Sequence, residues 1–144
     1  MAARSKARKR AVDVLFEADQ RGASPLTVLR DQQARGAGGA NPYTAVLVTG
    51  VVDHLDQIDE LLTQHSVDWP VERMPAVDRA VLRIGIFELL WSTEVPDAVV
   101  IDEAVQLAKV LSTDESPGFV NGLLGTLVEV KPQGVTARHD EEYT

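Results

Sequence analysis

The chain has 144 residues and no cysteine, which excludes disulfide bonds and thiol chemistry. Its formal net charge is −8, yet five of its first ten residues are basic and none is acidic, so the remainder carries −13. This asymmetry predicts a polyanion-binding arm on an acidic body. No apolar run approaches the roughly 20 residues that span a bilayer, and acidic residues after the basic block argue against a signal peptide. We expect a cytoplasmic protein without membrane contact.

Helical spacing dominates the first half of the chain. Apolar residues recur on one helix face from residue 5 to Gly22, where the glycine ends the helix. Ser24-Pro25 is a cap followed by proline and predicts a second helix to about residue 34. The glycine-rich segment 35–41 is predicted to be a flexible loop, and Asn41-Pro42 begins one long helix to about residue 66.

The second half continues in the same manner. Two prolines in residues 67–75 leave room for one short helical turn, and the strongly apolar helix 76–92 is predicted to be buried on more than one side. A helix beginning at residue 97 or 99 follows, and Ser116-Pro117 begins the last one. Pro132 and Gly134 are expected to end that helix, and residues 132–144 are predicted to form a disordered acidic tail.

No run of alternating apolar and polar residues predicts a strand. We therefore expect an all-α fold: one compact domain of six or seven helices over residues 1–131.

Signatures of enzymes and metal sites are missing from the sequence. It contains no glycine-rich phosphate loop and no nucleophile elbow, so we expect no catalytic residue and no cofactor. His54 and His65 would share a helix face, but about 16 Å of helix separates them, too far for one metal ion. The acidic stretch 53–60 lacks the turn glycine of a calcium loop and is predicted to be a solvated helix face.

The basic block is the strongest candidate for a binding function. On a helical wheel, Lys9 lies beside Phe16, and Arg8 borders the apolar stripe. Cations next to an exposed ring suit single-stranded nucleic acid, because the cations meet phosphates while the ring stacks on a base. The alternative is a solvated helix start with a core phenylalanine. The predicted contacts in the block are Arg4, Lys6, Arg8, Lys9 and Arg10.

A resemblance to the NusB family of bacterial transcription antitermination factors is carried by residues 76–129, AVDRAVLRIGIFELLWSTEVPDAVVIDEAVQLAKVLSTDESPGFVNGLLGTLVE. The stretches that carry it are AVLRIGIFEL, VP followed by VVIDEAVQLAK, and FVNGLLG. The opening pattern R..A...LF, from Arg8 to Phe16, matches as well. The similarity covers about residues 4–130, and several motifs in the right order make it specific.

The resemblance implies an all-helical fold of two small bundles and a non-catalytic role. NusB proteins bind the boxA element of nascent ribosomal RNA together with ribosomal protein NusE, within RNA polymerase antitermination complexes. These partners are therefore expected for this chain as well.

Site residues follow from the same resemblance. It implies RNA contacts through Arg4, Lys6, Arg8 and Phe16, and it adds two segments near the RNA and NusE surfaces. The further RNA candidates in these segments are Arg79, Arg83, Phe119 and Asn121, and the partner-binding candidates are Asp78 and Glu115.

Some of these residues have a second interpretation. Arg83 can pair with Asp78 or Glu88, Phe119 can belong to the core, and Asn121 can cap or bridge helices. Gly122 and Gly125 are one helical turn apart and predict close helix packing rather than ligand approach. Gly118 and Ser5 stand where relatives often carry basic residues, which lowers the expected affinity but leaves the mode of binding unchanged.

Two rival functions belong to other classes. NusB-like domains also occur fused to a ribosomal RNA cytosine methyltransferase, but the chain ends at Thr144 without a methyltransferase half, so we expect no methyl transfer. A homodimeric protein-interaction module is the other rival, because the central helices are rich in valine and leucine.

Overall fold

The structure is a computed structural model that describes residues 3–36, 41–66, 69–92 and 94–143, with side chains described up to residue 131. Its described residues form seven α-helices and one short 3₁₀ turn, with no strand, which confirms the all-α prediction. In chain order the elements are α1 (Ala3–Arg21), α2 (Pro25–Ala34), α3 (Pro42–Asp53), α4 (Leu55–His65), η1 (Val71–Arg73), α5 (Ala76–Trp91), α6 (Asp97–Leu111) and α7 (Ser116–Tyr143).

Side-chain caps explain where α2 and α3 begin. The hydroxyl of Ser24 accepts a hydrogen bond from the backbone N–H of Leu26 at 3.3 Å. Similarly, the Asn41 Oδ1 accepts one from the backbone N–H of Tyr43 at 2.9 Å. In both cases a proline follows the cap, and its missing N–H costs nothing at the first helical position. Both predicted starts are confirmed.

The prediction of one long helix from residue 42 to 66 is wrong, because His54 interrupts it. This residue has φ −116° and ψ 18°, outside helical values, and it is both the C-cap of α3 and the N-cap of α4. Its ring stacks on Trp91 with centroids 4.1 Å apart. The apolar periodicity continues across the break, and for that reason the sequence pattern did not reveal it.

The last helix also differs from the prediction. The backbone of α7 continues to Tyr143 instead of ending at Pro132 and Gly134. A proline removes a single i→i−4 hydrogen bond, so a helical path can continue beyond it with a local distortion. The disorder proposed for residues 132–144 stays a prediction. Of the predicted loop 35–41, residues 37–40 lie outside the described residues.

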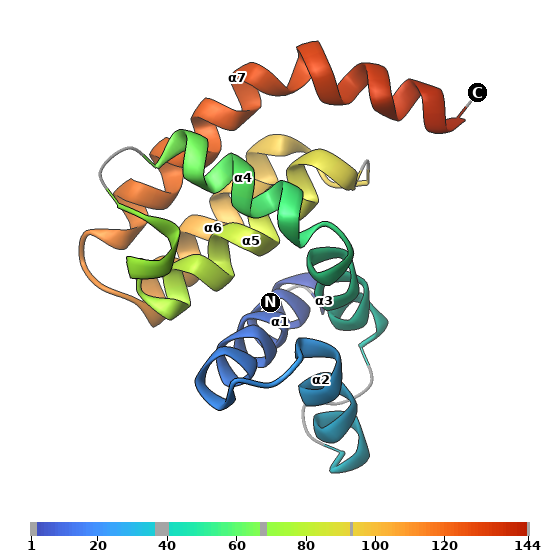
Figure 1. The fold of residues 1–144 in the computed structure, drawn as a ribbon, viewed down its shortest axis with the longest axis vertical. Helices are drawn as coiled ribbons and strands as arrows, with labels where there is room; N and C mark the ends of the chain where they lie inside the picture. Colours follow the sequence, from blue (N-terminus) through green and yellow to red (C-terminus); the bar gives the residue numbers. More distant parts are fainter. Residues whose placement is uncertain (1–2, 37–40, 67–68, 93, 144) are drawn as a thin grey trace.

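The helices form two groups joined by α5. Figure 1 shows α1, α2 and α3 packed together in the lower part of the view and α4 to α7 in the upper part. Eleven of the 16 residues of α5 are buried, and this helix contacts α1 and α3 of the first group as well as α4, α6 and α7 of the second. The two predicted bundles therefore share a single hydrophobic core.

Two glycines permit close packing, but neither is one of those predicted from the sequence. A Cβ at Gly50 of α3 would overlap the ring of Phe87, and one at Gly85 of α5 would lie 3.0 Å from Leu124. By contrast, a Cβ at Gly122 or Gly125 would meet nothing within 4 Å. The prediction that these last two glycines allow close helix packing is therefore wrong.

Candidate nucleic-acid interface

The exposed side of α1 carries most of the predicted arm. Lys6 and Lys9 are exposed and Arg10 is half-buried. Lys9 lies 3.7 Å from Asp13, an exposed pair of little energetic value, while Lys6 and Arg10 have no ion pair with any described residue. Phe16 is the exposed aromatic of this helix, with 38% of its surface accessible. The structure thus leaves three cations of the arm and the ring of Phe16 at least partly accessible on α1.

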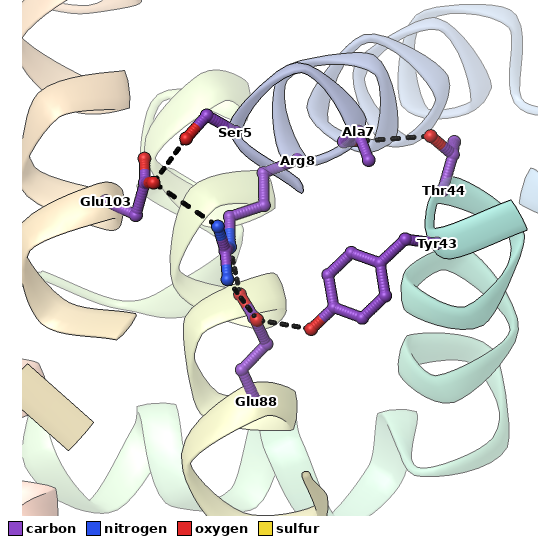
Figure 2. Close-up of polar contacts among 7 residues, drawn as sticks. All are labelled: Ser5, Ala7, Arg8, Tyr43, Thr44, Glu88 and Glu103. Carbon is purple, nitrogen blue, oxygen red and sulfur yellow. Dashed lines mark hydrogen bonds and ion pairs between the residues drawn. The ribbon is translucent and has the colours of Figure 1, made fainter. Parts of the chain in front are cut away.

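Arg8 does not lie on that surface. Its side chain is only 4% exposed, and its Nε and Nη2 donate to the two carboxylate oxygens of Glu88 at 2.8 and 2.9 Å. Its Nη1 lies 3.4 Å from Glu103 of α6. Figure 2 shows the guanidinium between these two carboxylates. The prediction of a surface position for Arg8 is corrected: position 8 faces α5, where the buried Glu88 carboxylate needs a cationic partner.

The buried pair extends into a network that ties α1 to three other helices. The Tyr43 hydroxyl of α3 donates to Glu88 at 2.6 Å, and the Thr44 hydroxyl donates to the Ala7 carbonyl at 3.2 Å (Figure 2). Ser5 donates to Glu103. This network anchors the first turns of α1, from which the exposed cations project.

Burial and charge set the protonation of this network. Burial by itself lowers the pKa of Arg8, but the hydrogen bonds and charge of Glu88 outweigh it, so that this pKa is raised. Burial and the Glu88 carboxylate together raise the pKa of Tyr43 to about 12. Both groups therefore keep their protons at neutral pH, and Tyr43 remains a hydrogen-bond donor.

Arg4 lies at the solvent edge of the same network. Its guanidinium carbon lies 4.7 Å from the centroid of the Tyr43 ring, and its Nη2 lies 2.8 Å from Glu94. The exposed ion pair contributes little, whereas the contact with the ring orients the side chain. Arg4 is thus held near the start of α1 but stays accessible to a ligand.

Arg79 and Arg83 come together in a groove between α1, α4, η1 and α5. The groove encloses about 520 Å³ and is also lined by Asp19, Asp59 and Glu72. Arg83 binds Asp59 through both of its carboxylate oxygens at 2.9 and 2.8 Å, so the suggested partners Asp78 and Glu88 are wrong. The Arg79 Nη2 lies 3.0 Å from Asp19. Asp59 belongs to the acidic stretch 53–60, which is therefore not purely a solvated face.

Asp78 is placed in the interior, which corrects its prediction as a surface contact for a partner. It is fully buried and accepts hydrogen bonds from the hydroxyls of Ser112 and Ser116, the latter at 2.8 Å. Ser116 is the first residue of α7, so the carboxylate lies at the positive end of that helix dipole. The hydroxyl donors and the helix N-terminus take the place of the water that would otherwise solvate the Asp78 carboxylate.

Phe119 lines a second, open hollow of about 550 Å³. Its ring is half-buried and packs edge-on against Trp69, with centroids 5.1 Å apart. Glu115 also lines this hollow, and on the α7 side Gly118 and Gly122 leave it open because they have no side chain. Phe119 is thus both a neighbour of the core and accessible from this hollow. Asn121 is exposed on α7 but does not line it.

The predicted residues therefore fall into three places on the surface: the outer face of α1, the groove with Arg79 and Arg83, and the hollow with Phe119 and Glu115. Sequence reasoning missed Tyr43, Trp69, Asp19 and Asp59, which contact the predicted residues. Trp69 carried a weak signal, because it is an aromatic residue beside a proline. Asp59 lay in the acidic stretch 53–60, which was predicted to be a solvated helix face, and Asp19 carried no signal.

Other kinds of site find no support in the described part of the chain. No three His, Asp or Glu side chains there converge in a way that could hold a metal ion. None of the helices described combines the length and the apolar composition needed to cross a membrane.

Comparison with known proteins agrees with the arrangement of these helices. Residues 5–129 match the model of the NusB family. The chain belongs to the NusB family. The transcription antitermination protein NusB of Kineococcus radiotolerans is 57% identical over 131 residues, covering 91% of this chain and 96% of the relative. That of Streptomyces coelicolor is 58% identical over 137 residues, covering 92% and 96%.

Solved structures of the NusB family share the fold. NusB of T. maritima superposes with a TM-score of 0.79 at 28% identity, covering 90% of this chain and 92% of that one. A crystal structure of the antitermination factors NusB and NusE in complex with dsRNA gives a TM-score of 0.77 at 27% identity, covering 88% and 96%. Most of each relative is thus represented in this chain.

Proposed function

We propose that this protein is a transcription antitermination factor that binds the boxA element of nascent ribosomal RNA together with ribosomal protein NusE. The observation that carries the proposal is the identity of 57–58% to transcription antitermination proteins over nine-tenths or more of both chains. The similarity to a NusB–NusE complex with RNA supports the two partners. The role is non-catalytic and belongs to the cytoplasmic RNA polymerase antitermination complex.

The geometry supports a division of labour within the interface. The exposed cations of α1 supply attraction to phosphates that does not depend on sequence. The accessible rings of Phe16 and Phe119 offer surfaces on which unpaired bases stack. Arg79 and Arg83, in the groove between α1, α4, η1 and α5, can grip a phosphate or a base edge through paired donors.

Fluorescence anisotropy with a labelled boxA RNA tests the proposal. The control is a scrambled RNA of equal length, and both are titrated at two salt concentrations with and without NusE. We expect tighter binding to boxA than to the scrambled RNA, weaker binding at higher salt, and an increase in affinity when NusE is present. Equal binding to both RNAs would reduce the interface to a general polyanion site, and no binding under any condition would contradict the proposal.

A further inference from the structure

The two arginines of the groove are paired with carboxylates and largely shielded from solvent, whereas the ion pairs of the arm, Arg4–Glu94 and Lys9–Asp13, are exposed. Arg83 forms a two-point pair with Asp59, and Arg79 is paired with Asp19. Their side chains are only 21% and 12% exposed. Lys6, by comparison, is exposed and has no ion pair with any described residue.

The groove holds its arginines in place from more than one side. Arg79 Nη1 donates to the backbone carbonyls of Val71 and Met74 at 3.0 and 3.4 Å, which fixes the guanidinium against η1. Asp19 then meets Nη2 from α1, and Asp59 meets Arg83 from α4. A carboxylate bound through both oxygens occupies the position that a phosphate would take on a guanidinium. A phosphate that approaches the groove must therefore displace a carboxylate or bind beside it against like-charge repulsion.

We propose that Asp19 and Asp59 are specificity-determining residues that withhold Arg79 and Arg83 from non-specific polyanions. This inference rests on the proposed function in RNA binding. Any polyanion meets the open cations of α1, but only a ligand that is correctly held elsewhere on the protein gains enough contact energy to displace the two carboxylates. Specificity is a difference of affinities, and a built-in repulsion against the wrong ligand increases it.

The proposal predicts a characteristic effect of neutralising the two carboxylates. In the double variant Asp19→Asn/Asp59→Asn the arginines become open to any phosphate, so affinity for scrambled RNA rises by about tenfold and affinity for boxA rises less. Two newly available cations also release more counterions. The slope of log affinity against log salt for scrambled RNA therefore steepens by about 1.4, at about 0.7 for each phosphate contact on a single strand.

A matched control separates this effect from net charge. The double variant Asp53→Asn/Glu60→Gln also removes two negative charges. Both positions are exposed, at the end of α3 and on α4, and neither lines the groove. We expect this control to raise affinity for both RNAs by the same small factor and to leave the salt slope unchanged. Thermal unfolding of both variants verifies that each is folded at the temperature of the titrations.

The titrations compare wild type, groove variant and control on boxA RNA, scrambled RNA and heparin, a polyanion without bases. If the groove variant behaves like the control on every ligand, or if it binds scrambled RNA more weakly, the proposal is wrong. Heparin keeps this test independent of the proposed function. If wild type does not prefer boxA, the RNA proposal fails, whereas tighter binding of heparin by the groove variant alone still supports the withholding of the two arginines.

Discussion

Arg8 and Glu88 form the most deeply buried ion pair among the described residues, and this pair gives α1 a fixed position. Both side chains are almost completely excluded from solvent, at 4% and 1% exposure. Two buried charges do not by themselves stabilise a fold, because their desolvation offsets much of their attraction. Removal of either partner alone, however, would leave the other as an uncompensated buried charge. A substitution of Arg8 that weakens RNA binding therefore reports first on the fold and only second on RNA contact.

We predict that Arg8→Met lowers the free energy of unfolding by about 3–5 kcal/mol, since it leaves the Glu88 carboxylate buried without its cation. The double variant Arg8→Met/Glu88→Leu should recover much of that loss, because the uncompensated charge is removed as well. Urea denaturation followed by circular dichroism measures the stability of both single variants, Arg8→Met and Glu88→Leu, and of the double variant. A double variant that is less stable by the sum of the two single losses would show that the two residues act independently, contrary to the structure.

Through Tyr43, the stability that this network contributes depends on pH in the alkaline range. Its pKa is raised from 10 to about 12 in the folded protein by burial and by the hydrogen bond to Glu88. The folded state thus holds the phenolic proton more tightly than the unfolded state does. The stability that this group contributes is complete below pH 10 and declines as the pH rises towards 12.

We predict that absorbance at 295 nm, titrated from pH 8 to 13, contains a tyrosine that ionises near pH 12 in the native protein. The variant Tyr43→Phe, which retains Tyr143, should lack this component. It should also lose less stability between pH 10 and 12 than wild type does. Wild type and variant with superimposable titrations would contradict the assignment.

At the scale of elements, local signals in the sequence were sufficient to predict where most helices lie, but not which residues of other helices they contact. The Ser-Pro and Asn-Pro starts are local chemistry, and each marks a helix in the structure. At the break, His54 stacks on Trp91, which lies 37 residues away in the chain, and no local signal shows this contact. Likewise, a helical wheel placed Arg8 at the border of the apolar stripe, but only the packing of α1 on α5 brings it to Glu88.

The candidate site shows the same limit. The motifs that carry the resemblance to the NusB family identified Arg79, Arg83 and Phe119 as candidates, and the structure places the two arginines in the groove and Phe119 in the hollow. Sequence patterns did not distinguish Asp78, which is buried, from Asp59, which pairs with Arg83 at the surface. Which carboxylate faces an arginine depends on how α4 lies against α5, and nothing in the spacing of either segment encodes that crossing.

The contact between α3 and α5 depends on a glycine. We predict that Gly50→Ala lowers the free energy of unfolding by about 1–3 kcal/mol, because its Cβ would overlap the buried Phe87 ring. Gly125→Ala is the control: its Cβ meets nothing within 4 Å, and alanine favours a helix over glycine by up to about 1 kcal/mol. Thermal unfolding should therefore shift down in the first variant and up in the second. A stabilised Gly50→Ala protein would show that α3 does not approach α5 this closely.

For the whole molecule, the packing of α1 joins the separate parts of the interface. The exposed cations precede Phe16 on this helix, and Asp19, one turn after Phe16, reaches the groove through its pair with Arg79. Helix α1 thus carries both the arm and one residue of the groove, with a rise of about 1.5 Å per residue between them. Long-range attraction and local contact are therefore carried by different residues on one rigid element.

This separation predicts that charge and ring contribute to RNA binding in different ways. Replacing Arg4, Lys6, Lys9 and Arg10 by glutamine should make the slope of log affinity against log salt shallower by up to about 3, at about 0.7 for each lost phosphate contact. Phe16→Ala should leave that slope unchanged and weaken binding at every salt concentration by about 1–3 kcal/mol, the value of one stacked base. Both variants change side chains that are at least partly accessible to solvent, and unfolding curves verify that each remains folded. A slope unaffected by the loss of four cations would mean that phosphates contact another part of the surface, and the arm would then have no role in attracting RNA.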